Sequence, residues 1–342
     1  MSARSGILAG GNWIVDKLKF VDRYPRQDAL SSILSESIGN GGSPFNILVD
    51  LARLKVKFPL AGVGLIGADA NGEWIRNLCD EHGIHTAQVR VTDRAPTSYT
   101  DVMTVQSTGR RTFFHQRGAN ALLDADHFDF SSSRAKIFHL GYLLLLDRLD
   151  RPDAQFGTAA ARVLQRARKA GFKTSLDVVS EDSQRFAAIV PPALRHIDYA
   201  IVNDFEAERT TGIKIRRDGK ISREALRLAS AKFLEAGVRE WVIIHYPEGA
   251  SAMGADGLLR ICASLSIPKS EIISTVGAGD AFAAGVLCGL HNETPIEKAL
   301  DYGSCVAAAC LRGAGTSDAI QPLAECLELE KIFGLRSVRS SK

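Results

Sequence analysis

The chain has 342 residues, 45% of them apolar, and its 42 basic and 39 acidic residues leave a formal net charge of +3. This length and composition suit one large α/β domain with an insertion, or two domains, and exclude global disorder. No basic run would follow a nucleic-acid backbone, so we expect a small-molecule partner and neither nucleic acid nor membrane.

The six cysteines form no CxxC pair and mostly fall in apolar patterns, which is typical of free, packed thiols in a reducing compartment. Residues 1–16 hold an apolar stretch that is interrupted by glycines and is too short for a signal peptide. Eighteen consecutive apolar residues occur nowhere in the chain. We therefore expect a soluble, cytoplasmic protein without a metal cluster.

In the first third of the chain, we predict strands over residues 7–11 and 58–66 and a helix over 46–54. Residues 62–67 match the GxGxxG fingerprint of dinucleotide-binding turns. The surrounding run is continuous and apolar, and no acidic residue lies at the offset that the fingerprint requires. We therefore interpret these glycines as positions of close packing within a strand.

Two segments, about 15–37 and 97–116, interrupt the alternation of helices and strands. The second contains many strand-forming residues around a Ser107-Thr108-Gly109-Arg110 turn. These segments predict a small β-sheet that projects from the main layer. Such a sheet would close over a cleft as a lid and exclude water.

From about Asp153 onward, helices predicted over 154–170, 181–190 and 223–236 alternate with strands over 173–178, 199–203 and 241–245. This order indicates a parallel sheet covered by helices.

Residues 264–273 are interpreted as the end of a sheet. Thr294-Pro295-Ile296-Glu297 is interpreted as a capping box that begins a helix running to Arg312. A single domain, with the two interrupting segments inserted in it, is expected to span 1–336, followed by a disordered tail over 337–342.

The most informative stretch runs from Ser274 to Phe282, where a glycine turn opens a buried helix and places Asp280 in its first turn. Free N–H groups and the positive end of the helix dipole suit a transferring phosphate. No lysine follows the glycines, so this is not a Walker-type loop. Acidic residues also favour the first turn of any helix, so the stretch alone leaves a structural role open.

Three other features of the sequence each allow both a functional and a structural interpretation. The turn before residue 46 would present backbone N–H groups and the Asn46 amide to ligand hydroxyls, or would simply cap a helix. Asp16 fits a surface loop or a hydroxyl-binding carboxylate. Asn203 and Glu206 lie where doubly wound folds bind ligands, but the same pattern makes an ordinary capping box. The eight histidines show no metal spacing and are interpreted as structural.

Taken together, these residues resemble the ribokinase-like sugar kinases, also called the phosphofructokinase-B family. The resemblance covers nearly the whole chain in the right order. It rests on Asp16, on Gly41-Gly42 with Asn46, on Gly67 with Asp69 and Gly72, on Asn203 with Glu206, on Gly277-Ala278-Gly279-Asp280, and on Arg312-Gly313-Ala314-Gly315. It implies a three-layer α/β/α sandwich with a mainly parallel sheet and a small projecting β-sheet lid.

The resemblance also implies roles for particular residues. Asp280 would be the general base, and Gly277, Ala278 and Gly279 would form the anion hole. Asp16, Gly41, Gly42 and Asn46 would hold the sugar hydroxyls. Asn203 and Glu206 would organise magnesium-bound phosphates, with Glu206 acting through water. The remaining nucleotide contacts would come from Gly249, Thr275, Gly303, Ala307 and Ala308.

Three departures from the family pattern concern the nucleotide and cation sites. Ser274 replaces an aspartate tied to a monovalent cation, the glycine pattern near residues 245–249 is altered, and Asp177 lacks the asparagine that often follows two positions later. Monovalent-cation activation is therefore left open. The resemblance implies a dimeric kinase that uses ATP and Mg²⁺ to phosphorylate a sugar or sugar acid, in the manner of fructokinases or ketodeoxygluconate kinases. A nucleoside kinase and a non-catalytic sugar or nucleotide sensor are the alternatives.

Overall fold

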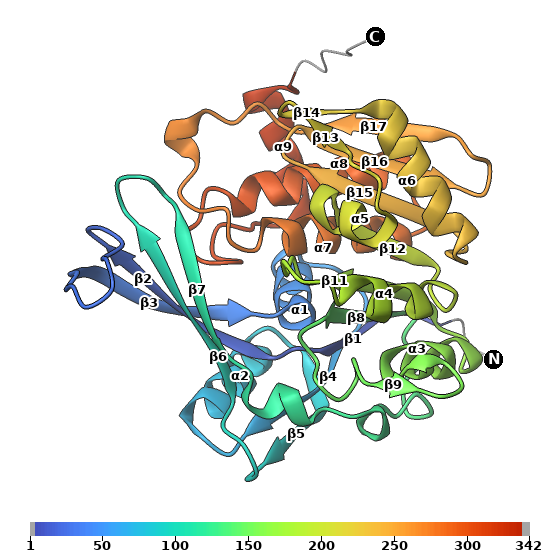
Figure 1. Cartoon of the computed structure of the whole chain (residues 1–342), viewed down its shortest axis with the longest axis horizontal. Helices are drawn as coiled ribbons and strands as arrows, with labels where there is room; N and C mark the ends of the chain where they lie inside the picture. The colour runs from blue at the N-terminus through green and yellow to red at the C-terminus, as the bar shows by residue number, and fades with distance from the viewer. Residues whose placement is uncertain (1–3, 337–342) are drawn as a thin grey trace.

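A computed structural model describes residues 4–336, and its centre is a nine-stranded sheet (Figure 1). The strand order is β17-β16-β15-β12-β11-β8-β1-β4-β5. All neighbours from β15 to β5 pair in parallel, whereas β16 and β17 are antiparallel to their neighbours. The strands are β1 (Ile7–Gly11), β4 (Leu60–Gly67), β5 (His85–Thr92), β8 (Ile137–Leu143), β11 (Lys173–Val178), β12 (Tyr199–Asn203), β15 (Trp241–Tyr246), β16 (Gly249–Gly254) and β17 (Leu259–Ala263).

Helices cover both faces of this sheet, as the alternation of helices and strands predicts. One apolar cluster packs the sheet against α1 (Ser43–Arg53), α2 (Ala70–Glu81), α7 (Ala278–His291), α8 (Ile296–Cys310) and α9 (Leu323–Phe333). The other packs it against α3 (Ala159–Lys169), α4 (Phe186–Leu194), α5 (Asp204–Thr211) and α6 (Arg223–Glu235). Alternate strand residues, such as Ile243 and Ile244, enter opposite clusters, which is why these strands are apolar throughout.

A four-stranded sheet with the order β3-β2-β6-β7 projects from the body of the molecule (Figure 1). Its strands are β2 (Ile14–Val21), β3 (Ile33–Gly41), β6 (Ser98–Val105) and β7 (Arg111–Gln116). The β2–β6 pair is parallel and the other two pairs are antiparallel. The two segments predicted to leave the main layer therefore do form a small sheet, and residues 106–110 make the expected turn between β6 and β7.

The GxGxxG segment lies inside β4, as its continuous apolar pattern predicts. The indole of Trp13 crosses this strand, and its Nε1 donates to the Val63 carbonyl at 2.9 Å. A Cβ on Gly64 would lie 2.0 Å from the Trp13 ring, and one on Gly62 would lie 2.4 Å from it. These glycines therefore make room for a buried aromatic side chain and do not form a dinucleotide-binding turn.

Several predicted boundaries are wrong for local physical reasons. Residues 152–158 form the hairpin β9 (Pro152–Asp153) and β10 (Gly157–Thr158), and α3 begins only after Thr158, whose hydroxyl caps the Ala161 N–H at 3.1 Å. The helix predicted over 181–190 is α4, which starts later, at Phe186. Residues 264–273 hold no strand, because the sheet ends at Ala263 and is followed by the short 3₁₀ turn η3 (Lys269–Glu271).

The capping box predicted at Thr294 is also wrong. The Thr294 hydroxyl donates to the Gly289 carbonyl at 2.8 Å, and Pro295 occupies the N-cap position of α8. That helix ends at Cys310, two residues before the expected Arg312. The smaller elements are the hairpin β13 (Arg216–Arg217) and β14 (Lys220–Ile221) and the 3₁₀ turns η1 (Gly118–Leu122) and η2 (Ala125–His127).

The cysteine thiols are unpaired, and all except Cys262 are buried. Within residues 4–336, no helix combines the length and apolar character needed to cross a membrane. The tail predicted to be disordered lies outside the described residues.

Candidate active site

A cleft of about 610 Å³ opens at the carboxyl edge of the large sheet, between the small sheet and the start of α7. Parallel strands end together at this edge, so side chains distant in the chain meet there. The cleft lining includes nine of the predicted site residues, from both halves of the chain: Asp16, Gly42, Asn46, Asn203, Glu206, Thr275, Gly277, Gly279 and Asp280.

The glycine turn is built around Gly277, which is the N-cap residue of α7. Its φ of 77° lies in the left-handed region that glycine adopts at little cost. A Cβ at this position would lie 2.8 Å from the Thr316 side chain and 2.9 Å from its backbone. The backbone N–H groups that follow Gly277 have no partners within the helix, so the turn presents donors at the positive end of the helix dipole.

Asp280 lies in the first turn of α7 and is 5% exposed. Its Oδ2 accepts hydrogen bonds from Asn46 Nδ2 and from the Tyr142 hydroxyl, both at 2.7 Å. Burial raises the pKa of this carboxyl group, and the bonds from Asn46 and Tyr142 oppose that rise. The geometry gives a fixed carboxylate with enhanced basicity at the wall of the cleft.

Two more carboxyl groups lie close to Asp280. Burial, followed by repulsion from Glu206 and Asp280, raises the pKa of Asp177 well above its usual value. Asp177 Oδ2 accepts a bond from the Ser43 hydroxyl at 3.0 Å. Burial also raises the pKa of Glu206 to about 7. Because several acidic groups share one buried region, a bound cation or shared protons would relieve their repulsion.

Asn203 and Glu206 form the capping box of α5. Asn203 Oδ1 accepts from the Glu206 N–H at 2.9 Å, and Glu206 Oε2 accepts from the Asn203 N–H at 2.9 Å. Glu206 Oε1 also accepts from the Ser180 hydroxyl at 2.7 Å. The pair therefore caps a helix and also lines the cleft, and its role in binding a ligand stays a prediction.

Asp16 projects from β2 into the cleft and is 9% exposed, which excludes the surface-loop interpretation. Its neighbour Gly41 needs to lack a side chain, because a Cβ there would lie 2.4 Å from Asp16 Oδ1. Gly42 is the N-cap of α1 with a φ of 86°, and a Cβ on it would lie 2.4 Å from the Asn12 carbonyl oxygen. The two glycines thus let β3 and α1 approach the carboxylate closely.

Burial, partly opposed by a hydrogen bond from Thr100, raises the pKa of Asp16 to about 8. A carboxyl group with a raised folded-state pKa contributes stability at low pH and loses it as the pH rises through the folded value. We expect Asp16→Asn to raise the melting temperature, with a gain that grows between pH 5 and pH 8 and reaches a few kcal/mol in free energy of unfolding. Thermal unfolding across that range measures it.

The matched control for this prediction is Asp101→Asn. Asp101 lies on the neighbouring strand β6 and pairs with Lys19 away from the cleft. Its replacement should give no gain that grows with pH. An Asp16→Asn melting temperature that falls relative to the wild type as the pH rises would show that Asp16 is ionised and stabilising in the folded protein.

Among the cleft residues that the sequence analysis did not identify are Arg111, His115, Tyr142 and His245. Tyr142 lies at the end of β8, and strand-end position was the signal that could have identified it. Arg111 Nη2 donates to the Thr275 hydroxyl, which joins the small sheet to the glycine turn. His115 and His245, interpreted from the sequence as structural, thus lie in the cleft wall.

Four predicted nucleotide contacts lie outside this cleft. Gly249 is the first residue of β16, where a Cβ would lie 2.2 Å from the Cys262 carbonyl oxygen. Gly303 packs against Phe282 of α7, with a virtual Cβ 2.8 Å from that ring. Ala308 is buried and Ala307 is partly exposed. Strand and helix packing therefore account for the two glycines, and a role for these four residues in nucleotide binding stays a prediction.

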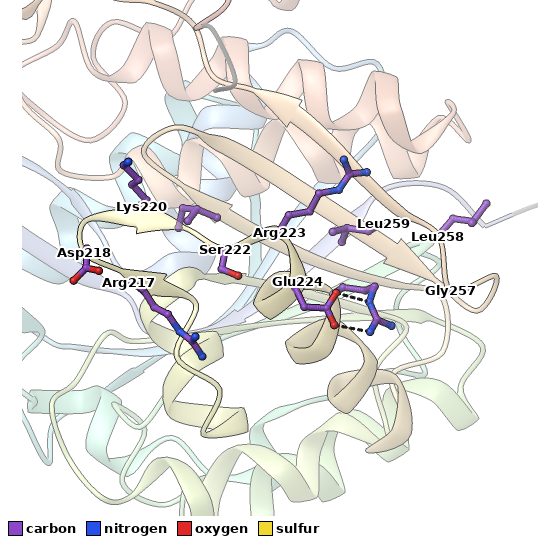
Figure 2. Close-up of a pocket in the computed structure, with 11 residues that line it drawn as sticks. Arg217, Asp218, Lys220, Ser222, Arg223, Glu224, Gly257, Leu258 and Leu259 are labelled. Atoms are coloured by element: carbon purple, nitrogen blue, oxygen red, sulfur yellow. Dashed lines mark hydrogen bonds and ion pairs between the residues drawn. The ribbon is translucent and has the colours of Figure 1, made fainter. Parts of the chain in front are cut away.

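A larger depression of about 850 Å³ lies elsewhere, beside the start of α6 and the β13–β14 hairpin (Figure 2). Its walls include Arg217, Lys220 and Arg223, and Glu224, which is labelled in Figure 2, forms an ion pair with Arg227. It contains no residue of the glycine turn and no buried carboxyl group. Size alone therefore does not single out a candidate site, since the smaller cleft is the one that brings together the glycine turn and the buried carboxyl groups.

Comparisons with known proteins agree with this geometry. A family model described as pfkB family carbohydrate kinase matches residues 13–322. The chain belongs to this family and is a carbohydrate kinase. It is 28% identical over 313 residues to a ribokinase from Arabidopsis thaliana, covering 91% of this chain and 77% of the relative. It is 25% identical over 319 residues to an ATP-dependent ribose-1-phosphate kinase from Halopiger xanaduensis, covering 92% and 96%.

Among solved structures, the fold is similar to that of Arabidopsis thaliana ribokinase complexed with ribose and ATP. The TM-score is 0.78 at 23% identity, covering 96% of this chain and 99% of the other. The ribokinase-like sandwich expected from the sequence is thereby confirmed.

Proposed function

We propose that this carbohydrate kinase transfers the γ-phosphoryl group of ATP to a hydroxyl group of a small polyhydroxylated acceptor, such as a sugar or sugar acid. The observation that carries the proposal is the position of Asp280. Its buried carboxylate stands one turn from Gly277, at the junction between the helix N–H donors and the pocket formed with Asp16 and Asn46. That junction is where an acceptor hydroxyl and a transferring phosphate would meet.

In the proposed reaction, Asp280 accepts the proton of the acceptor hydroxyl while the backbone N–H groups after Gly277 stabilise charge on the phosphoryl oxygens. The raised pKa of Asp280 strengthens it as a base. Asn46 and Tyr142 hold its orientation through Oδ2. Phosphoryl transfer depends mainly on positioning and electrostatics, which are the properties this arrangement supplies.

The donor half of the cleft fits a magnesium–nucleotide. Asp177 and Glu206 supply buried carboxyl oxygens, which are ligands of the kind that Mg²⁺ prefers. The Glu206 oxygens already accept bonds from Ser180 and Asn203, so we propose that this residue acts through magnesium-bound water. Magnesium bound there would neutralise charge on the phosphates.

Arg111 gives the small sheet a role in the reaction, because it brings a cation from β7 to Thr275 beside the glycine turn. We expect Arg111→Ala to lower kcat by roughly 10²-fold, with a smaller change in the acceptor KM, since the charge would act on the transferring phosphate. Steady-state kinetics with both substrates varied measure this. Arg110→Ala is the matched control, because Arg110 precedes Arg111 in the chain and is exposed at the end of the β6–β7 turn. Equal effects of the two substitutions would contradict the proposal.

A coupled assay tests the proposed function. ADP release is measured with ATP, Mg²⁺ and a panel of free sugars, sugar acids, sugar phosphates and nucleosides. Acceptor-dependent ADP release supports a kinase, and a preference for nucleosides would favour the alternative of a nucleoside kinase. Binding of an acceptor and ATP without ADP release from any panel member would instead favour the non-catalytic sensor. Location in the cytoplasm stays a prediction from the sequence.

We further propose that the protein is a homodimer joined through the small sheet. Both edge strands of that sheet expose large apolar side chains: Ile33, Leu34 and Ile38 on β3, and Phe113 and Phe114 on β7. Such a concentration of apolar surface indicates a contact with another protein surface. A second copy of the chain would cover it and protect the open sheet edges.

Sedimentation velocity tests the dimer. We expect the wild-type protein to sediment as a dimer and the double variant Ile38→Glu with Phe114→Glu to sediment as a monomer, because charges resist burial at an interface. Leu228→Glu on α6 is the control, since Leu228 is also exposed but lies outside the small sheet. A wild-type monomer at micromolar concentration would contradict this proposal.

A further inference from the structure

A chain of buried hydrogen bonds begins at Asp50, which lies one helical turn after Asn46 in α1. The Ser317 hydroxyl donates to Asp50 Oδ1. Asn40 Nδ2 donates to Ser317 Oγ at 2.9 Å and to Asn46 Oδ1 at 2.7 Å. Asn46 Nδ2 then donates to Asp280 Oδ2 at 2.7 Å. The chain therefore connects Asp50 with the proposed base, although Asp50, Ser317 and Asn40 are not among the residues that line the cleft.

Packing does not explain the acidic side chain of Asp50. It is fully buried, on a helix whose residues Ile47, Leu48 and Leu51 belong to the apolar core. Burial raises the pKa of Asp50 well above its usual value, although the hydrogen bond from Ser317 opposes the rise. Its Oδ2 finds no hydrogen-bond partner within residues 4–336. A buried acid with an unpartnered oxygen costs stability that an apolar side chain of similar shape would not.

The number of available hydrogens fixes the order of donors along the chain. A serine hydroxyl has one hydrogen, and Ser317 gives it to Asp50, so Ser317 can only accept from Asn40. Asn40 must therefore point its NH₂ group at Ser317, and the second hydrogen of that group reaches Asn46 Oδ1. Asn46 is left with its own NH₂ group toward Asp280. Asp50 can accept whether ionised or protonated, since a protonated carboxyl group keeps a carbonyl oxygen.

The reverse order of donors would disable the base. If the Ser317 hydroxyl turned to Asn40, the Asn40 oxygen would accept from it and from Asn46. Asn46 would then turn its amide oxygen toward Asp280 Oδ2. Two acceptors would face each other across 2.7 Å unless Asp280 carried a proton, and a protonated carboxyl group cannot accept another. This order requires that Asp50 does not accept from Ser317.

From this arrangement we propose that Asp50 is a positioning residue for the phosphoryl transfer. By accepting the hydrogen of Ser317, it holds the Asn46 amide, through Asn40, in the orientation that donates to Asp280. This inference rests on the proposed kinase function and adds to it a residue outside the cleft.

Two substitutions at Asp50 test the inference by steady-state kinetics with both substrates varied. Asp50→Asn keeps an oxygen that can accept from Ser317, whereas Asp50→Leu has the same branching at Cγ and no acceptor. We expect Asp50→Asn to stay close to the wild-type kcat and Asp50→Leu to lower kcat by roughly 10-fold to 10²-fold, as for other losses of fixed geometry. The KM for ATP should not change, because the chain leads to the base. Equal kcat in the two variants would overturn the inference.

Thermal unfolding separates positioning from packing. Asp50→Leu should be at least as stable as the wild type, because it removes a buried acid. Val49→Ala is the control, since Val49 is buried on the same helix and makes only apolar contacts. It should lower the melting temperature and leave kcat unchanged. The same pattern in Asp50→Leu would show a packing role and overturn the inference.

A double-mutant cycle tests whether Asp50 acts through Asn46. If it does, Asp50→Leu has no further effect on kcat once Asn46 is replaced by alanine. Effects of Asp50→Leu on kcat that are equal in the presence and absence of Asn46 would overturn the proposed route, because independent sites act additively in free energy.

Side-chain NMR decides the inference even if no compound of the panel releases ADP, in which case the kinase proposal fails separately. In protein labelled with ¹⁵N-asparagine, the NH₂ signals of Asn46 are assigned by their loss in Asn46→Ala. A hydrogen bond to Asp280 should displace them from the usual amide position in the wild type and in Asp50→Asn. We expect Asp50→Leu to move them toward that position. Unchanged Asn46 signals in Asp50→Leu would overturn the inference, whatever the activity of the enzyme.

Discussion

Asp280→Asn is expected to lower turnover by roughly 10²–10⁴-fold, which is the usual contribution of a positioned general base. The amide has nearly the same shape as the carboxylate, and its oxygen can still accept from Asn46 and Tyr142, which both bond to Oδ2 in the wild type. The fold should therefore persist. Loss of a buried acidic group with a raised pKa should leave thermal stability equal or higher. Initial rates of ADP release and thermal unfolding measure the two effects.

Glu224→Gln is the matched control for Asp280→Asn. Glu224 also lies in the first turn of a helix, α6, but it pairs with Arg227 beside the larger depression and outside the cleft. Its replacement should leave turnover unchanged. Unchanged turnover in Asp280→Asn would remove that residue from the role of base, whereas a large loss in Glu224→Gln would place the reaction at the other depression.

Gly277→Ala is expected to lower kcat by about 10³-fold, because it should displace the N–H donors that stabilise the phosphoryl group. Two physical effects combine at this position. The φ of 77° is strained for alanine, and its Cβ would lie 2.8–2.9 Å from the side chain and backbone of Thr316. Backbone atoms cannot move aside as a flexible side chain would, so the turn itself has to shift.

Gly212→Ala separates these two effects. Gly212 ends α5 with a φ of 72°, and a Cβ there would meet nothing within 4 Å. It therefore carries the backbone strain of about 1 kcal/mol without the clash. We expect both alanine variants to lose stability and only Gly277→Ala to lose kcat. Near-normal kcat in a folded Gly277→Ala variant would contradict the proposed anion hole.

The strand pattern of the sheet could be predicted because strands buried on both faces are apolar throughout. Residues 173–178 and 199–203 are strands with the predicted boundaries. The sequence could not predict where a side chain makes a different hydrogen bond from the one that its motif suggests. Thr294 has the sequence of a capping residue but donates backward to Gly289, and residues 152–158 form a hairpin where a helical pattern suggested α3.

The residues of the candidate site also fall into two groups, those that the sequence could predict and those that it could not. Residues within one turn of a motif, such as Asn203 with Glu206 or Gly277 with Asp280, could be identified as candidates from their spacing together with the order of the motifs along the chain. Tyr142 and Arg111 reach the site through tertiary contacts with residues more than a hundred positions away. The sequence carries no local signal for Arg111, and for Tyr142 the one signal is its position near the end of a strand. Asp16 was ambiguous for a related reason, since its burial depends on how the small sheet meets the large one.

A crystal structure with a non-hydrolysable ATP analogue, Mg²⁺ and a neutral acceptor such as D-ribose tests the central claim most directly. We predict that an acceptor hydroxyl lies within hydrogen-bonding distance of the Asp280 carboxylate, and that the terminal phosphate faces the N–H groups after Gly277. An acceptor bound in the cleft with its hydroxyl groups away from Asp280, and with the terminal phosphate outside the glycine turn, would contradict it.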